Sequence, residues 1–329
     1  MKLINIPDIS PADDDFTKLQ LGESVTWLGF SGLPKNELER RVRPIRLSRY
    51  RGALEAARAA GPTDVIISHL PAMSVAVAGA LGCLQKRNRH LAFAFNFTNL
   101  PRGLRKRAVA RAARSIDQFT VFSRYEIGLY SNYFDCCPDK FQNLIWTQDK
   151  PQPSNFIHRP DASQYFCAIG GEGRDIRIVI ECAKKHFPNF EFVIITRPHL
   201  IEDMSIPDNV TILTNLPLAD TWAVAERSIA VLVPLDAEDR CCGHITLVSA
   251  KLMGLPIVTT DSPATIEYTS GRPSILKSQA RNERDFSINL QRAIDERDEL
   301  KMIAEKAAPL EREFHSRSKW ECYLRNFLP

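Results

Sequence analysis

The chain has 329 residues and a net charge of +4, and 44% of its residues are hydrophobic and 25% are charged. This balance is typical of a folded globular protein and excludes a largely disordered one. The length predicts two domains of about 150 residues each. Basic residues do not gather with aromatic residues or in a nucleic-acid-reading motif, so we expect no nucleic acid among the partners.

The eight cysteines match neither the spacing of a zinc site nor that of a secreted disulfide framework. We therefore expect reduced thiols and a cytoplasmic protein. The first residues lead into an apolar, strand-like segment without a signal region. No apolar run approaches the roughly 20 residues that a helix needs to span a bilayer. The sequence predicts neither a membrane span nor export by a signal peptide.

In the first half of the chain, β-rich apolar runs alternate with helical patterns, which predicts an α/β domain with a parallel sheet covered by helices on both faces. We expect strands at 2–6, 25–28, 64–69, 91–97 and 118–122, and helices at 48–60, 72–85, 102–116 and 124–133. The stretch 147–161 contains three prolines and interrupts this pattern. It is the predicted linker, and it closes an N-terminal domain of residues 1–152.

The pattern restarts in the second half, with strands expected at 165–169, 192–196, 210–213, 229–233 and 257–260. A glycine turn at 170–173 precedes a helix that runs to 185, and charged helices follow at 283–296 and 297–314. These elements predict a second domain, residues 153–314, and a C-terminal helix within 315–329 that packs on the first domain. Two such domains predict a cleft between them, where ligands usually bind.

The turn after the strand that ends at Val233 carries the strongest functional signal. Gly243 lies in the loop, and the helix that follows runs to about Met253. The first amides of that helix, at His244, Ile245 and Thr246, have no intrahelical acceptor, and the positive end of the helix dipole lies behind them. Such a turn binds phosphate.

With these elements placed, the second half resembles the donor-binding domain of a GT-B glycosyltransferase, most of all glycosyltransferase family 4 and its relatives. Family members commonly read Gly-Gln-x-Thr-Leu-Leu-Glu-Ala, followed by Gly-Lys-Pro or Gly-Leu-Pro. Here the chain reads GHITLVSA from Gly243 and GLP from Gly254, with no gap in the spacing. The resemblance implies the GT-B architecture, in which two Rossmann-like, doubly wound parallel-sheet domains face a central cleft.

The segment GGEGRDIRIVIECA is similar to the family's glycine turn, in which a basic residue at the helix start meets the donor diphosphate. Arg174 matches that residue. The loop after the strand at 210–213 resembles the one that flanks the nucleobase. The resemblance implies that a nucleotide sugar is a substrate and that no cofactor is needed. The implied donor site comprises Gly170, Gly171, Gly173, Arg174, Leu216, Gly243, His244, Ile245, Thr246, Ser249 and Lys251.

The chain also departs from the family pattern. The family's paired glutamates fall at Cys241 and Ser249, so both carboxylates are absent, and the second of them normally binds the ribose. Lys251 or Arg240 could compensate for lost donor contacts. Lys251 lies two turns after His244 on the same helix face, and its side chain is expected to lean toward the helix start. The alternative for Lys251 is a solvated surface lysine.

In the first half, the segment AFAFNFTNLPRG resembles the one that brings a histidine to the cleft, and Asn96 occupies that place. His69 matches another cleft-facing histidine of the family, and its alternative is a strand-end residue held by loop backbone. No Asp-x-Asp metal pair appears at a suitable strand end, so we expect transfer without a metal. Retention, as in family 4, needs no strong base. Inversion would need Asp13, Asp14, Asp15 or His69 to deprotonate the acceptor.

The predicted helix at 102–116 is strongly basic, with Arg102, Arg105, Lys106, Arg107, Arg111 and Arg114. Such a helix can dock on an anionic membrane surface, which would place the protein at the inner face of the cell membrane. It carries no Trp or Phe to enter the interface, and a solvated helix packed on its own sheet is the alternative.

The sequence thus predicts a metal-independent glycosyltransferase that moves a sugar from a nucleotide-sugar donor to a glycan or lipid-linked acceptor, in cell-surface polysaccharide or glycolipid synthesis. A non-catalytic GT-B binding or regulatory partner is one alternative, favoured by the missing glutamates, although such a protein would have no need to keep Gly243 and Arg174. A sugar-nucleotide epimerase of the same fold is another, and it would need more acid and base groups than the sequence offers.

Overall fold

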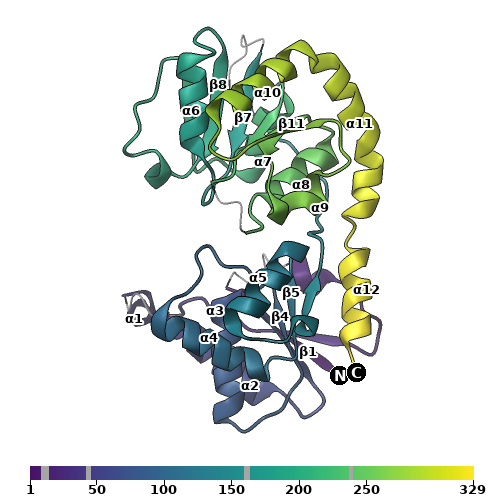
Figure 1. Cartoon of the computed structure of the whole chain (residues 1–329). Coiled ribbons are helices and arrows are strands. Elements are labelled where there is room, and N and C mark those ends of the chain that lie inside the picture. The colour runs from purple at the N-terminus through teal and green to yellow at the C-terminus, as the bar shows by residue number, and fades with distance from the viewer. Residues whose placement is uncertain (9–14, 42–45, 159–163, 237–239) are drawn as a thin grey trace. The chain divides into compact units, whose positions relative to one another are not determined.

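The computed structural model describes residues 1–8, 15–41, 46–158, 164–236 and 240–329 (Figure 1). The chain forms two compact units. The first unit comprises Met1–Ile145 and Arg317–Pro329, and the second comprises Trp146–Ser316. The predicted base candidates Asp13 and Asp14 lie outside the described residues, and Asp15 begins a short 3-10 helix, Asp15–Lys18.

The first unit is built on a six-stranded sheet in the order β2-β1-β3-β4-β5-β6, and every strand pair is parallel. Parallel strands require crossover connections, which the helices between them supply. The strands are β1 (Lys2–Ile6), β2 (Thr26–Gly29), β3 (Val65–His69), β4 (His90–Phe93), β5 (Gln118–Val121) and β6 (Phe141–Asn143). The helices are α1 (Glu37–Arg41), α2 (Leu47–Ala59), α3 (Pro71–Cys83), α4 (Gly103–Ser115), α5 (Arg124–Phe134) and α12 (Ser318–Phe327).

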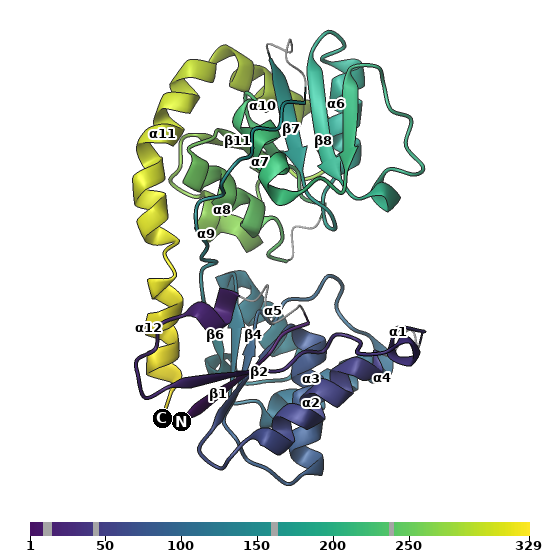
Figure 2. The same ribbon diagram turned by 180° about the vertical axis from the view of Figure 1, so that it is seen from behind.

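The C-terminal helix α12 packs within the first unit, and Figure 2 shows the two chain ends side by side. Its Trp320 ring lies 4.9 Å from the Phe93 ring and 5.7 Å from the Phe16 ring, centroid to centroid. The Trp320 indole also donates to the Ile145 carbonyl at 2.9 Å. Burial of the large indole, with its polar N–H satisfied, holds the last helix on this unit.

The second unit also has a six-stranded parallel sheet, in the order β12-β11-β10-β7-β8-β9. The strands are β7 (Tyr165–Ile169), β8 (Glu191–Thr196), β9 (Val210–Thr214), β10 (Val231–Val233), β11 (Ile257–Thr260) and β12 (Ile275–Ser278). The helices are α6 (Ile176–Lys185), α7 (Leu218–Glu226), α8 (His244–Met253), α9 (Ile266–Thr269), α10 (Glu283–Asp295) and α11 (Arg297–Phe314). Counted from β7, this is the 3-2-1-4-5-6 order of a dinucleotide-binding fold.

Apolar patterning explains why the core of the second unit lies where it does. All five residues of β7 and all three of β10 are buried, as expected for central parallel strands covered on both faces. The apolar side chains along one face of helix α6 are buried. Asp175 caps the first turn of this helix by accepting a hydrogen bond from the Ile178 amide at 3.1 Å. The fixed helix start holds the preceding glycine turn against the end of β7.

The α/β class and the parallel sheets are confirmed, and five of the described α-helices and strands were missed, of which α1 and α9 are single short turns of helix. The other three are the longer helix α7 and the strands β6 and β12, and both strands are short edge strands, which leave little periodicity to read. The strand expected at 91–97 was too long. It ends at Phe93 because Ala94 adopts φ 55° and turns its amide to the Thr120 hydroxyl at 3.0 Å. Asn96 therefore lies in a loop.

Gly254 gives a test of the packing of α8 against α11. It ends α8 with φ 73°, and a Cβ there would lie 3.0 Å from the Glu305 Cα. Gly254→Ala should lower the free energy of unfolding, measured by urea denaturation, by about 1–3 kcal/mol because a strained backbone and a backbone contact add together.

Gly271→Ala is the matched control. Gly271 lies in the same unit with φ 71°, but no atom lies within 4 Å of its Cβ position. Its loss should reflect backbone strain alone and be smaller than that of Gly254→Ala. Equal losses in the free energy of unfolding would show that the close contact of α11 with Gly254 adds no destabilisation to the backbone strain.

Candidate functional site

The candidate site lies where the strand order of the second sheet reverses. The central strands β7 and β10 are neighbours, but their crossovers run to opposite sides of the sheet. In open α/β sheets, ligands bind beyond the carboxyl ends of the strands at such a switch point. The turn after β7 is the glycine turn Gly170 to Gly173, and the loop after β10 leads to Gly243.

The first turn is shaped around the Arg174 side chain. Gly170 has φ 146° and Gly173 has φ 79°, conformations that glycine adopts without strain. Arg174 folds back over Gly170, where a Cβ would lie 2.8 Å from the Arg174 Cγ. Its Nε donates to the Ile169 carbonyl at 3.2 Å. Only glycine leaves room for the arginine to lie in this way.

The second turn meets the same guanidinium. Gly243 has φ 79° and precedes α8, and a Cβ there would lie 3.4 Å from the Arg174 Nη1 and 2.9 Å from Leu235. The Arg174 Nη2 donates to the Thr246 hydroxyl in the first turn of α8 at 3.3 Å. One arginine therefore contacts both predicted phosphate turns.

Backbone hydrogen bonds fix the two turns to each other. The Asp236 amide donates to the Gly173 carbonyl at 3.1 Å, and the Asp175 amide donates to the Pro234 carbonyl at 3.1 Å. Neither bond depends on a side chain. The position of Arg174 is therefore set by the backbone of both loops.

The site is rich in positive charge. The Arg240 guanidinium lies over Gly173, and Arg197 lies 3.3 Å from the Cβ position of Gly171. Burial, with the nearby charge of Arg240, lowers the pKa of Arg174. No described residue forms an ion pair with Arg174, and Arg197 has only Glu172 at 3.9 Å. Guanidinium groups without a carboxylate partner are suited to bind phosphate oxygens in pairs.

Helix α8 adds main-chain donors to these arginines. The Leu247 amide is the first to bond inside the helix, to the Gly243 carbonyl at 2.9 Å, so the amides of the first turn have no intrahelical acceptor. The His244 ring packs against Trp146 and Tyr268, and burial lowers its pKa to about 3. His244 is therefore neutral at physiological pH and contributes its backbone, not a charge.

Ser249 lies on α8 one turn beyond Thr246, and its hydroxyl accepts from the Gln148 amide at 2.5 Å. The Gln148 carbonyl oxygen in turn accepts from the Trp146 indole at 2.8 Å. Gln148 was not singled out from the sequence because it lies in the predicted linker, far from α8 in the chain. The position that resembles the ribose-binding glutamate thus holds a serine already bonded to an amide.

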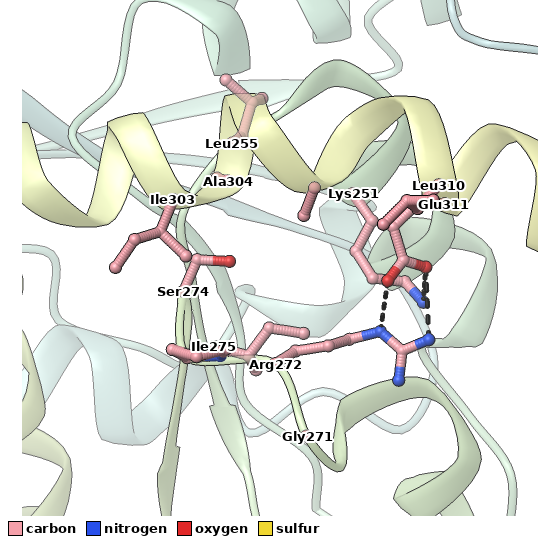
Figure 3. A pocket seen from close by; sticks show the side chains of 12 residues that line it. Lys251, Leu255, Gly271, Arg272, Ser274, Ile275, Ile303, Ala304, Leu310 and Glu311 are labelled. Atoms are coloured by element: carbon pink, nitrogen blue, oxygen red, sulfur yellow. Dashed lines mark hydrogen bonds and ion pairs between the residues drawn. The ribbon is translucent and has the colours of Figure 1, made fainter.

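The expected direction of the Lys251 side chain was wrong. Its ammonium does not reach back to the helix start but donates to the Glu311 carboxylate at 2.9 Å (Figure 3). It also donates to the His315 Nε2 at 2.8 Å. The carboxylate belongs to the neighbouring helix α11. Its attraction for the ammonium outweighs the usual tilt of a helix side chain toward the N-terminus of its own helix. Of the two residues expected to compensate for lost donor contacts, Lys251 and Arg240, it is Arg240 that lies at the glycine turn. Leu216 follows β9, two strands from β7 at the same sheet edge.

His69 lies at the end of β3 in the first unit and is a poor base. Its Nε2 lies 2.7 Å from the Asn5 side-chain oxygen, and its ring packs against Phe16 and Phe93. Burial lowers its pKa to about 3. A group with so low a pKa accepts protons weakly at neutral pH.

Asn96 supports the structure of the first unit. Its side-chain amide donates to the Glu126 carboxylate at 2.7 Å. Glu126 is fully buried and also accepts from the Tyr130 hydroxyl at 3.0 Å and the Phe122 amide at 3.2 Å. A buried carboxylate needs such donors. The contact explains why an asparagine stands here, and a role of Asn96 toward the sugar stays a prediction.

No family model and no curated protein matches the chain. Solved structures do. HepE from Anabaena, in complex with UDP, matches 100% of this chain and 99% of its own at TM-score 0.72 and 11% identity. The chain has the GT-B fold. Sucrose-phosphate synthase from Thermosynechococcus elongatus matches 98% of this chain and 97% of its own, at TM-score 0.74 and 12% identity. The α,α-trehalose 6-phosphate synthase from Burkholderia multivorans matches 100% of this chain and 98% of its own, at TM-score 0.69 and 11% identity.

At these identities the likeness is one of fold, and the narrower resemblance to family 4 stays a prediction. Across the described part of the chain, no helix combines the length and apolarity that a membrane span requires. Nor do three or more His, Cys, Asp or Glu side chains within the described ranges gather as metal ligands.

Arg174 and Glu311 should behave in opposite ways when they are replaced. Arg174→Met removes a partly buried cation that has no carboxylate partner, so we expect the free energy of unfolding without ligand to change by less than about 1 kcal/mol. Glu311→Met leaves Lys251 and Arg272 without their carboxylate and should cost about 3 kcal/mol or more. Urea denaturation measures both. A large loss for Arg174→Met would make this arginine a structural residue.

Proposed function

We propose that the chain is a glycosyltransferase that takes a sugar from a nucleoside-diphosphate donor, with UDP-sugars as the first candidates. The observation that carries the proposal is Arg174, which spans two glycine turns at the switch point and has no carboxylate partner among the described residues. The fold supports it, because HepE, which shares the fold, has been solved with UDP and with UDP-glucose.

The proposed mechanism depends on stabilising the leaving diphosphate. Negative charge builds on that group as the bond to the sugar breaks, and fixed donors aimed at it lower the barrier. Arg174 and Arg240 supply guanidinium groups, and the first turn of α8 supplies amides with the helix dipole behind them. These donors can replace a divalent ion, so we propose transfer that does not require a metal.

Retention of anomeric configuration is the outcome that we favour. Inversion needs a base to deprotonate the acceptor hydroxyl, and His69, with a pKa lowered to about 3 by burial, is poorly suited to that role. A retaining transfer can proceed without a strong protein base. Two of the acidic candidates, Asp13 and Asp14, lie outside the described residues.

A nucleotide-binding protein without transfer activity is the second candidate. Cys241 and Ser249 stand where the family resemblance places carboxylates, and Ser249 is bonded to Gln148. A hydroxyl supplies fewer acceptor sites than a carboxylate, so ribose binding would be weaker. Release of free nucleoside diphosphate on incubation with a donor and acceptor distinguishes the two candidates.

For the acceptor, we propose a glycan or lipid-linked sugar of cell-surface polysaccharide or glycolipid synthesis, reached at the cytoplasmic face of the membrane. Helix α4 supports this choice. Its Leu104 side chain is 81% exposed, and its arginines at 105, 107, 111 and 114 form no ion pair with any described residue. A basic face with an exposed leucine suits an anionic lipid surface.

Binding of UDP tests the donor site directly. Isothermal titration without magnesium should detect UDP, and Arg174→Met should weaken it by about 1–3 kcal/mol, or roughly 5- to 150-fold. Arg177→Met, at an exposed arginine of α6 near the same turn, is the control and should bind as the wild type does. Equal affinity in all three proteins would remove Arg174 from the site. Failure of UDP, ADP and GDP alike would contradict the proposed function.

Liposome sedimentation tests the membrane proposal. Replacing both Arg105 and Arg107 by glutamine should weaken binding to vesicles rich in anionic lipid by about 2 kcal/mol, or roughly 30-fold. The matched control replaces two exposed lysines of α11, Lys301 and Lys306, and should change little. Equal binding to neutral and anionic vesicles would contradict the proposal.

A further inference from the structure

A second concave feature of the second unit lies away from the phosphate turns. It is a pocket of about 180 Å³ between α8, α11 and the segment that leads into β12. Figure 3 shows its charged side chains, Lys251, Arg272 and Glu311, gathered at one end. Much of the remaining wall is apolar and includes Leu255, Ile275, Ile303, Ala304 and Leu310. None of the residues of the two glycine turns lines it.

The charged end holds two cations and one carboxylate. Arg272 donates from Nε to the Glu311 Oε1 at 2.5 Å and from Nη2 to Oε2 at 3.3 Å, a forked pair that neutralises both groups. Lys251 shares Oε2 at 2.9 Å, and its side chain is only 4% exposed. With Lys251 protonated, the cluster therefore carries one surplus positive charge in a largely buried place, which is unfavourable without a further anion.

Lys251 also has a donor to spare. His315 donates from Nδ1 to the Trp146 carbonyl at 2.7 Å, so its Nε2 presents a lone pair to the Lys251 ammonium at 2.8 Å. Burial lowers the pKa of His315, which favours the neutral ring. Glu311 and His315 accept hydrogen bonds from two of the three ammonium protons. No described residue accepts a hydrogen bond from the third, and the Tyr268 ring lies 5.8 Å from Nζ.

We propose that this pocket binds a small monocarboxylate, with the carboxylate on the Lys251 ammonium and a short alkyl chain against the wall formed by Ile275, Ile303 and Leu310. One surplus charge matches a monoanion. The volume of about 180 Å³ leaves room for a carboxylate with a short alkyl chain, such as butyrate. Glu311 also faces this end of the pocket, but Arg272 neutralises it.

The affinity should depend on pH through Lys251. Burial and the charge of Arg272 lower its pKa to about 7, and Glu311 opposes them. The groups that face the ammonium are Glu311 and His315 from the end of α11, Arg272 from the segment before β12, and the Tyr268 ring from α9. A carboxylate binds the protonated form, so binding weakens as the pH rises through 7.

Titration of the full chain with sodium butyrate tests the proposal, with butyramide as a neutral ligand of the same size. We expect butyrate to bind about tenfold more weakly at pH 8 than at pH 6, as follows from a pKa of about 7, and butyramide to bind at least tenfold more weakly than butyrate at pH 6. Equal affinity for the two ligands, no pH dependence, or no binding of butyrate at tens of millimolar would overturn the proposal.

Two variants locate the site. Lys251→Met keeps the pair between Arg272 and Glu311 and should lose butyrate binding at least tenfold. Ala307→Leu adds bulk to the pocket wall without touching a charge and should also abolish binding. Circular dichroism checks that each variant is folded. If butyrate bound both folded variants as it binds the wild type, it would not lie in this pocket.

Discussion

The contact of one guanidinium with two glycine turns is the constraint on which the candidate site depends. Arg174 can lie over Gly170 and reach Thr246 only because Gly170 carries no side chain. Gly243 leaves the start of α8 free to lie close to Leu235. Backbone bonds between the two loops hold the turns at the distance that the arginine spans. The strand order brings β7 and β10 side by side and so places both turns at one sheet edge. The strand order thus brings the two turns together, and Gly170 leaves room for Arg174 to contact both.

Two clusters of the second unit differ in which groups accept hydrogen bonds from their cationic side chains. At the glycine turns, Arg174 has neutral oxygen partners and no carboxylate among the described residues. In the pocket beside α11, Lys251 and Arg272 share Glu311. The loss of Glu311 would leave both cations without their carboxylate and is costly, whereas an arginine with no carboxylate partner among the described residues, at the carboxyl ends of the strands, is available to a diphosphate. The contrast is the physical reason for assigning phosphate binding to Arg174 and not to Lys251.

Much of the fold could be predicted from the sequence because its signals are local. The helix from His244 to Met253 was placed from Gly243 and apolar spacing, and the positions of most long strands followed from β-branched runs. The site was only partly predictable. Arg174 was identified because it follows a glycine turn, but the direction of Lys251 is set by Glu311, 60 residues away in the chain. Contacts between such distant segments leave no pattern that periodicity can detect.

The first unit shows the same limit. His69 and Asn96 were selected as catalytic-site candidates, and in the structure His69 is paired with Asn5 and Asn96 supports the buried Glu126. Both partners lie tens of residues away, so no local pattern indicates that these polar groups form hydrogen bonds with one another. The transfer that we propose therefore depends on the arginines and amides of the second unit and not on a base from the first.

A crystal structure of the chain with UDP would test the central claim most directly. The account predicts diphosphate oxygens within hydrogen-bond distance of the Arg174 guanidinium and of the amides that follow Gly243, at the carboxyl ends of β7 and β10. A nucleotide bound elsewhere, with Arg174 still bonded only to Ile169 and Thr246, would contradict it.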